Sequence, residues 1–206
     1  MIHKYSTKLA GRYADRGIIQ REDVEIYSYG LEILISTIIT ITVLLISGFI
    51  LHEVFETIIL LAVYCPIRTF AGGYHTDSNL KCIATFIILY FLIILLYTNL
   101  IGTGIQHNYY LLIPVYISNI FILMLAPVET RLNPLPEKKK QGMKIKAFFY
   151  TFIYTGIITY IVVFNQIYSR FALLGSIAII GVTALVIIGK LKYGNREVKV
   201  WIKKRT

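Results

Sequence analysis

Cysteine, tryptophan and acidic side chains are scarce in this chain. Its 206 residues include 2 Cys and 1 Trp, and 11 Asp and Glu stand against 21 Lys and Arg. The 4 histidines are scattered and no CxxC or HExxH pattern occurs, which argues against the usual zinc sites. No Walker sequence or visible internal repeat indicates an ATP-driven pump or a repeat-built transporter. We therefore expect neither a metal nor a nucleotide cofactor.

Long apolar runs are what the chain has in abundance. Hydrophobic residues make up 56% of it, charged residues make up 16%, and the mean hydropathy is +0.67. The apolar residues form six continuous runs, at 31–51, 54–67, 83–101, 109–126, 147–164 and 171–189. A membrane-spanning helix needs about 20 such residues. Five runs reach that scale, whereas 54–67 is short and contains Pro66, which fits a short span, a re-entrant segment or a broken helix.

These runs predict an all-α integral membrane protein with about six transmembrane helices. We expect one polytopic domain over residues 1–206, made of an amphipathic N-terminal segment (1–30), a transmembrane bundle (31–189) and a basic tail (190–206). The first 30 residues lack the apolar core and cleavage site of a secretory signal peptide.

Basic residues predict the orientation of the bundle, because Lys and Arg beside a span mark its cytoplasmic side. With six crossings, the segments 1–30, 68–82, 129–146 and 190–206 share one face and hold 20 of the 21 basic residues. Only Arg170 falls on the opposite face. Both termini are therefore predicted to lie in the cytoplasm. This topology and contact with anionic lipid explain the net charge of +10, so no nucleic-acid partner is expected.

Two of the basic segments have a distinctive composition. Residues 1–30 alternate cations with Tyr, Leu and Ile, which predicts one or two amphipathic helices on the inner leaflet; a partly disordered basic arm is the alternative. Pro127, Pro134 and Pro136 predict an extended loop, rather than a helical hairpin, after the fourth run. That loop is expected to continue through the lysines that precede residue 147.

The stretch RTFAGGYHTDSNLKC, residues 68–82, contains the side chains best suited to chemistry. Gly72 and Gly73 allow a tight reversal that a β-carbon would obstruct. The residues at 76–79 are Thr, Asp, Ser and Asn, which are typical N-cap residues. A helix is therefore expected to begin at Asn79 or Leu80.

Cys82 would lie in the first turn of that helix, where the helix dipole and the charge of Lys81 favour a thiolate. Cys65 lies among apolar residues, so Cys82 is the better nucleophile. His75 is the histidine nearest to Cys82 in sequence. One continuous helix would separate the two by about 10 Å along its axis, so only a fold back at the glycines would bring them together. The residues alone leave open whether they form a catalytic pair.

Five residues in this stretch, Arg68, Gly72, Gly73, His75 and Cys82, carry a resemblance to a known family. Their spacing is similar to that in the active-site segment of the accessory gene regulator B family, whose members are membrane cysteine endopeptidases that mature quorum-sensing peptides. The segments EDVEIYSYGLE (22–32) and APVETRLNPLP (126–136) resemble the family's entry into its first span and its proline-bearing loop. With the six runs, the resemblance covers nearly the whole chain.

The resemblance implies that Cys82 is the nucleophile and His75 its base, without a cofactor, at an active site that faces the cytoplasm. The substrate would be a membrane-bound peptide precursor, closed into a thiolactone or lactone. Asp77 and Glu129 are candidates for orienting His75, although Asp77 is also a suitable N-cap. Arg68 is expected to bind a substrate carboxylate or to anchor its span at the headgroups.

Lys138, Lys139 and Lys140 are expected to bind the acidic tail that the family's precursors suggest; a cluster that only directs topology and contacts anionic lipid is the alternative. The family also makes a homodimer plausible. Two other classes of function stay open: a transporter or exporter of a small peptide without proteolytic activity, and a non-catalytic membrane scaffold. The position of Glu53 and Glu56 at the end of a span, rather than within one, counts against a transporter.

Overall fold

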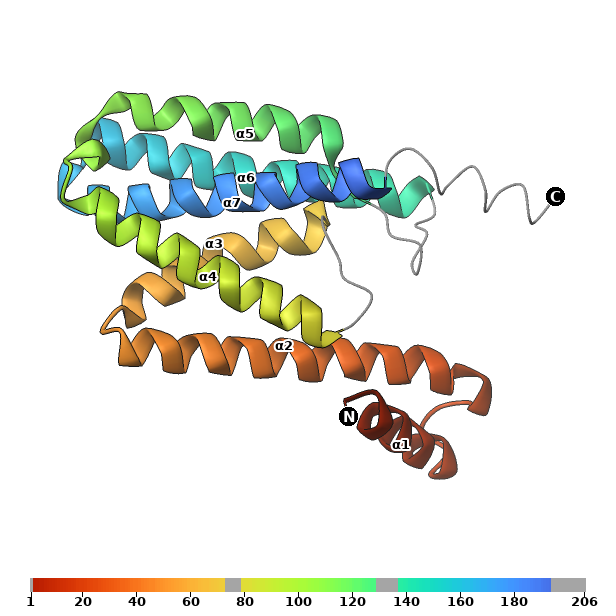
Figure 1. Cartoon of the computed structure of the whole chain (residues 1–206). Helices are drawn as coiled ribbons and strands as arrows, with labels where there is room; N and C mark the ends of the chain where they lie inside the picture. The colour runs from red at the N-terminus through yellow and green to blue at the C-terminus, as the bar shows by residue number, and fades with distance from the viewer. Residues whose placement is uncertain (1, 73–78, 129–136, 194–206) are drawn as a thin grey trace.

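The structure, a computed structural model, describes residues 2–72, 79–128 and 137–193 (Figure 1). The α-helices in these residues are α1 (Ile2–Asp15), α2 (Val24–Ile50), α3 (Val54–Ala71), α4 (Asn79–Ile101), α5 (Leu112–Leu125), α6 (Glu137–Phe164) and α7 (Ser169–Tyr193). Short 3-10 helices lie between them: η1 (Arg21–Asp23), η2 (Ile105–His107), η3 (Tyr109–Leu111) and η4 (Gln166–Tyr168). The described part of the chain contains no strand, so the predicted all-α class is confirmed.

Helix α7 forms the centre of the bundle, because it packs against α3, α4, α5 and α6. In its most apolar stretch 67% of the residues are buried, compared with 17% in α2. Two glycines of α7 allow the neighbouring helices to approach it closely. A β-carbon at Gly175 would lie 3.2 Å from Ile158 of α6, and one at Gly181 would lie 3.4 Å from Ile93 of α4. Such close van der Waals packing is a main source of helix association where lipid tails are as apolar as the side chains.

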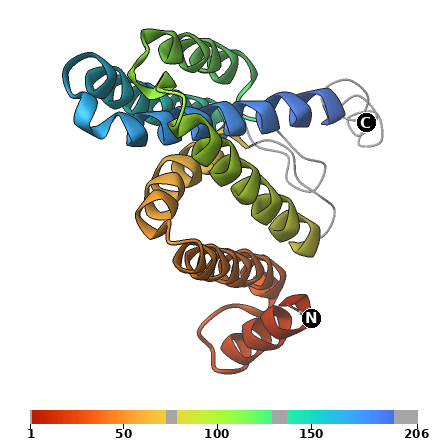
Figure 2. The ribbon, with the colours of Figure 1, turned by 60° about the vertical axis from the view of Figure 1, so that its left-hand side comes forward.

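Helices α1 and α2 form a pair at the side of this bundle (Figure 1, Figure 2). Hydrogen bonds join them between His3 and Glu32 at 3.0 Å and between Thr7 and Ser28 at 2.9 Å. Helix α2 in turn packs against α3 and α4. The N-terminal segment is therefore helical over Ile2–Asp15, and the alternative of a partly disordered arm is wrong there.

Among the described residues, five helical segments are long and apolar enough to cross a membrane: Arg21–Ile50, Val54–Ala71, Ile83–Ile101, Lys138–Phe164 and Gln166–Lys192. Because Val54–Ala71 is one continuous helix, the broken-helix alternative for the second run is wrong. The run at 109–126 does not form a helix of spanning length, because it divides into η3 and the 14-residue α5. At its start the Asn108 side chain accepts a hydrogen bond from the Tyr110 N–H at 3.0 Å, which stabilises the 3-10 turn.

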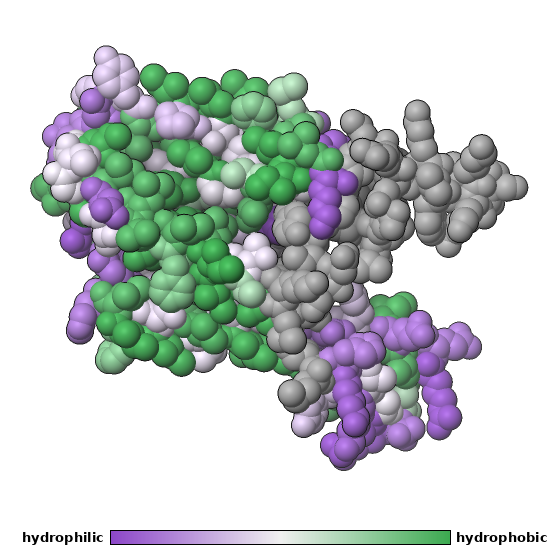
Figure 3. Space-filling model, in the orientation of Figure 1, coloured by the Kyte–Doolittle hydropathy of each residue, from purple (hydrophilic) through white to green (hydrophobic). Residues whose placement is uncertain are grey.

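The surface over the middle of the bundle is largely apolar, and hydrophilic residues gather towards the helix ends and on α1 (Figure 3). Phe49 of α2, Leu95 of α4 and Phe152 of α6 are among the large apolar side chains that are exposed. An apolar surface of this extent marks a membrane or protein interaction site. Together with five apolar helices of spanning length, it fits a multi-pass membrane protein.

Two helices begin earlier than predicted. Helix α6 begins at Glu137 rather than at residue 147, so Lys138, Lys139 and Lys140 lie on a helix and the prediction of an extended loop over these residues is wrong. The segment EKKKQGMKIK is rich in strong helix formers, and Pro136 directly precedes the helix, where proline removes no helical hydrogen bond. Helix α2 likewise begins at Val24 rather than at residue 31.

Helix α3 continues through Pro66 because α6 supplies the hydrogen bond that this proline removes. Pro66 has no N–H to offer the carbonyl of Ala62, four residues earlier. The Tyr154 hydroxyl of α6 donates to that carbonyl at 2.7 Å. Helix α3 therefore extends to Ala71 and carries Arg68 to the end of the bundle where α4 and α6 begin (Figure 1).

Candidate active site

The proposed nucleophile lies at the start of α4. This helix begins at Asn79, which confirms the start predicted from the N-cap residues, and Cys82 is its fourth residue. Backbone N–H groups in a first helical turn have no partner within the helix, and together with the helix dipole they favour an anion. Gly73, His75, Asp77 and Glu129 lie outside the described residues, so the pairing of His75 with Cys82 stays a prediction.

Gly72 ends α3 in a conformation that favours glycine. Its φ is 68° and its ψ is −139°, in a region where a residue with a β-carbon is strained. The Gly72 N–H donates to the Arg68 carbonyl at 3.1 Å, and the Arg68 guanidinium donates to the Gly72 carbonyl. Arg68 thus makes a contact within its own helix end that neither of its two predicted roles included.

The end of α3 also meets a segment more than fifty residues later in the chain. The Val128 N–H donates to the Ala71 carbonyl at 3.0 Å, and Gly72 and Val128 form a single parallel β-bridge. A β-carbon at Gly72 would lie 2.7 Å from the Val128 carbonyl oxygen, so no larger residue fits without movement. The backbones that lead into 73–78 and 129–136 therefore depart from the same place.

Helix α6 also packs against the last turns of α3, through contacts with Phe70. The rings of Phe70 and Tyr150 stack with centroids 5.5 Å apart, and the Lys146 Nζ lies 5.4 Å from the centroid of the Phe70 ring. Lys146, Tyr150 and the Tyr154 that bonds to Ala62 are spaced four residues apart, so they lie on one face of α6. This face fixes the position of the second half of α3.

The same α6 carries the predicted substrate-binding lysines on its first turn. Lys138 and Lys139 are exposed and Lys140 is half-exposed. Their helix begins at the end of the bundle where α3 ends, so the structure brings these cations to the same end as Arg68 and the start of α4 (Figure 1).

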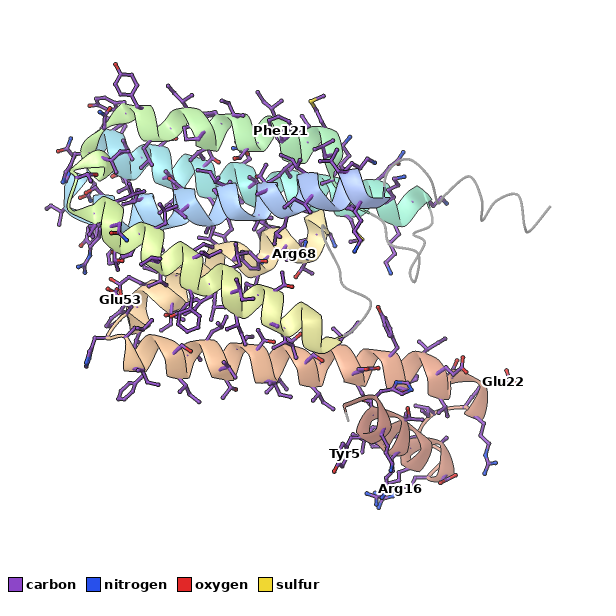
Figure 4. The ribbon with its side chains drawn as sticks, viewed as in Figure 1. Tyr5, Arg16, Glu22, Glu53, Arg68 and Phe121 are labelled. Atoms are coloured by element: carbon purple, nitrogen blue, oxygen red, sulfur yellow. The ribbon has the colours of Figure 1, made fainter. Side chains whose placement is uncertain are left out.

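Carboxylates lie at the opposite end of α3 from Arg68 (Figure 4). Burial raises the pKa of Glu53, the charge and hydrogen bond of Glu56 raise it further, and the charge of Arg170 lowers it. Glu53 and Glu56 lie at the start of α3, whereas His75 follows the end of this helix in the sequence. Among the described residues, no three His, Cys, Asp or Glu side chains are grouped in a way that would hold a metal ion.

The contacts made by Val128, Tyr150 and Tyr154 were missed by sequence reasoning. No local pattern pairs residue 72 with residue 128, because the contact is between backbones and joins distant segments. The one available signal was Pro66 inside an apolar run, which implied that the Ala62 carbonyl needed a donor from elsewhere.

Comparison with known proteins decides the family of the chain. The family model for accessory gene regulator B matches residues 6–188. The chain belongs to this family. It is similar to the AgrB-like protein 2 of Clostridium perfringens strain 13, with 30% identity over 148 residues that cover 70% of this chain and 69% of the relative. It is also similar to the accessory gene regulator protein B of Staphylococcus saprophyticus, with 26% identity over 150 residues that cover 73% and 76% of the two chains. No solved structure matches it.

Membership confirms the resemblance that the sequence indicated. The accessory gene regulator B family supports a role for this chain in the agr quorum-sensing system. A peptide-precursor partner is consistent with that role, and the apolar helices are consistent with work in a membrane.

Proposed function

We propose that this member of the accessory gene regulator B family is a membrane cysteine endopeptidase that cleaves a short quorum-sensing precursor and closes the product into a ring. One observation carries the proposal: the family match runs through the Arg68-to-Cys82 pattern. The position of Cys82 in the first turn of α4 supports it, because a thiolate is favoured there.

The first half of the reaction forms an acyl-enzyme. His75 takes the thiol proton, and the Cys82 sulfur attacks the carbonyl carbon of the scissile peptide bond. The tetrahedral intermediate then breaks its C–N bond, and His75 returns the proton to the leaving amine. N–H groups in the first turn of α4 would donate to the oxyanion. Asp77 or Glu129 would accept a hydrogen bond from the second ring nitrogen of His75 and so orient it.

The second half closes the ring. A thiol or hydroxyl within the retained peptide attacks the Cys82 thioester carbonyl, a new thioester or ester bond forms, and the Cys82 sulfur leaves and regains its proton. Thioester exchange is nearly isoenergetic, whereas hydrolysis is strongly downhill, so the site must limit water. A location at the membrane edge serves this purpose.

Topology and partners follow from the same proposal. The protein would lie in the cell membrane with six crossings, with α1 on the inner leaflet and both termini and Cys82 on the cytoplasmic side. The end of α3 and the starts of α4 and α6 lie at one end of the bundle (Figure 1). In a six-span arrangement this is the face whose segments hold 20 of the 21 basic residues, which supports a cytoplasmic location. A homodimer is part of the proposal on the strength of the family alone.

The decisive experiment uses a precursor whose ring-closing residue is replaced by Ala. With the wild-type protein it should leave a hydroxylamine-sensitive adduct on Cys82, detected by mass spectrometry, because nothing in the peptide can resolve the thioester. Cys82→Ala should abolish cleavage, Cys82→Ser should nearly abolish it, and His75→Ala should block acylation. Cys65→Ala is the matched control and should be almost silent, since Cys65 lies half-buried within α3.

Two results would overturn the proposal. Full cleavage by Cys82→Ala, or an adduct on Cys65, would remove the assigned nucleophile. Absence of any cleavage by purified wild-type protein in vesicles, with the peptide instead carried across the membrane, would favour the transporter.

A further inference from the structure

The contacts at the end of α3 bear on how the proposed active site is held in place. Arg68 bonds to the carbonyl of Gly72, Val128 bonds to the carbonyl of Ala71, and Phe70 stacks on Tyr150 of α6. Three consecutive residues, Phe70, Ala71 and Gly72, are thus each held by a different partner. His75 follows Gly72 by three residues, so the position and direction of the chain at Gly72 limit where the imidazole can lie.

We propose that the backbone junction of Gly72 with Val128, together with Arg68, fixes the point and direction in which the chain leaves α3 towards His75, and that catalysis depends on this junction. This rests on the proposed function and deepens it. In this arrangement Arg68 is a positioning residue rather than a ligand of the substrate carboxylate. The segment that ends at Val128 belongs to the active-site architecture, although it is distant in sequence from both catalytic residues.

Two features of the junction give it this role. Gly72 has φ of 68°, and its Cα faces the Val128 backbone so closely that a β-carbon would lie 2.7 Å from the carbonyl oxygen and 3.1 Å from the nitrogen. Backbone contacts of this kind have little freedom to adjust. The guanidinium of Arg68 then fixes the direction of the Gly72 carbonyl, and hence of the peptide bond that leads to residue 73.

The test separates positioning from substrate binding by the two kinetic constants. Gly72→Ala and Arg68→Gln should lower kcat by about 10- to 100-fold with KM nearly unchanged, which is the scale of loss that a misplacement of about 1 Å brings. The rate of Cys82 alkylation by iodoacetamide should also lose the part of its pH profile that depends on His75. Gly156→Ala is the matched control, since a β-carbon at Gly156 meets nothing within 4 Å.

A second variant covers the case in which Gly72→Ala does not fold. Replacing Val128 by its α-hydroxy acid through nonsense suppression removes only the N–H that donates to the Ala71 carbonyl, and it should lower kcat in the same way. An increase in KM with unchanged kcat in Arg68→Gln would overturn the positioning role in favour of carboxylate binding. Unchanged kinetics in Gly72→Ala and in the hydroxy-acid variant would overturn it outright. Cleavage by Cys82→Ala would instead refute the proposed function, so the two failures are distinguishable.

Discussion

The hydroxyl of Tyr154 supplies α3 with a hydrogen bond that its own backbone lacks at Pro66. Tyr154→Phe leaves the Ala62 carbonyl of α3 without a donor, and an interhelical hydrogen bond between membrane helices contributes about 1–2 kcal/mol at most. We expect the midpoint of unfolding in mixed SDS micelles to fall accordingly. Tyr160→Phe on the same helix is the matched control, because the Tyr160 ring is largely exposed and its ring contact with Phe164 survives the change.

Pro66→Ala tests whether Tyr154 replaces the hydrogen bond that the proline removes. An alanine at this position has an N–H that can donate to Ala62 within the helix, so Tyr154→Phe should cost little in that background. A double-mutant cycle with zero coupling between the two positions would contradict the assignment of Tyr154 as the substitute donor.

At the scale of the helices, the sequence predicted which segments are helical better than it predicted where they end. Apolar runs locate the membrane-embedded part of a helix, but EKKKQGMKIK shows that polar helix formers continue α6 outside it. The start of α4 was predictable because residue types that favour helix N-termini are a local signal in the sequence. The contact of Val128 with the end of α3 joins segments that the chain brings together only on folding, so no local pattern encodes it.

Two glycines of α2 offer a matched pair for testing how this helix packs. A β-carbon at Gly48 would overlap the Thr57 hydroxyl and lie 3.0 Å from its Cβ, whereas one at Gly30 meets nothing within 4 Å. Gly48→Ala should therefore destabilise the protein by about 1–3 kcal/mol through overpacking against α3. Gly30→Ala should stabilise it by up to about 1 kcal/mol through helix propensity. Equal shifts in thermal unfolding for the two variants would mean that α2 does not approach α3 at Gly48.

The lysines at the start of α6 are predicted to make the KM for the precursor depend on salt concentration. Changing Lys138, Lys139 and Lys140 together to Gln should raise KM roughly tenfold, since each exposed ion pair contributes at most about 1 kcal/mol. The salt dependence of KM should weaken, and kcat should hold. Changing Lys4, Lys8 and Arg12 of α1 to Gln removes equal charge from the same predicted face and is the control. Unchanged KM in the α6 variant, with correct insertion, would leave topology and lipid contact as the only role of the cluster.

At the scale of the whole molecule, the crossing that most needs testing is α5. Its 14 residues span about 21 Å as an α-helix, and η3 adds about 6 Å, against a hydrocarbon thickness of about 30 Å. Single cysteines at Thr103, Lys139 and Ile167, in a Cys65→Ala and Cys82→Ser background, test it with a membrane-impermeant maleimide. Positions 103 and 167 should react from outside intact cells, and 139 only after permeabilisation. Labelling of 103 and 139 from the same side would show that α5 does not cross.

The central place of α7 has a consequence for how the protein is made. Ribosomes synthesise α3, α4, α5 and α6 before the helix on which all four pack. Until α7 enters the bilayer, these helices lie in lipid without their common partner, although contacts such as the hydrogen bond from Asn119 of α5 to Thr155 of α6 do not require it. We therefore expect the bundle to reach its final packing only after α7 has entered the membrane. A chain truncated before α7 should therefore leave inserted helices with apolar faces that α7 would have covered, and we expect it to be degraded faster than the full chain.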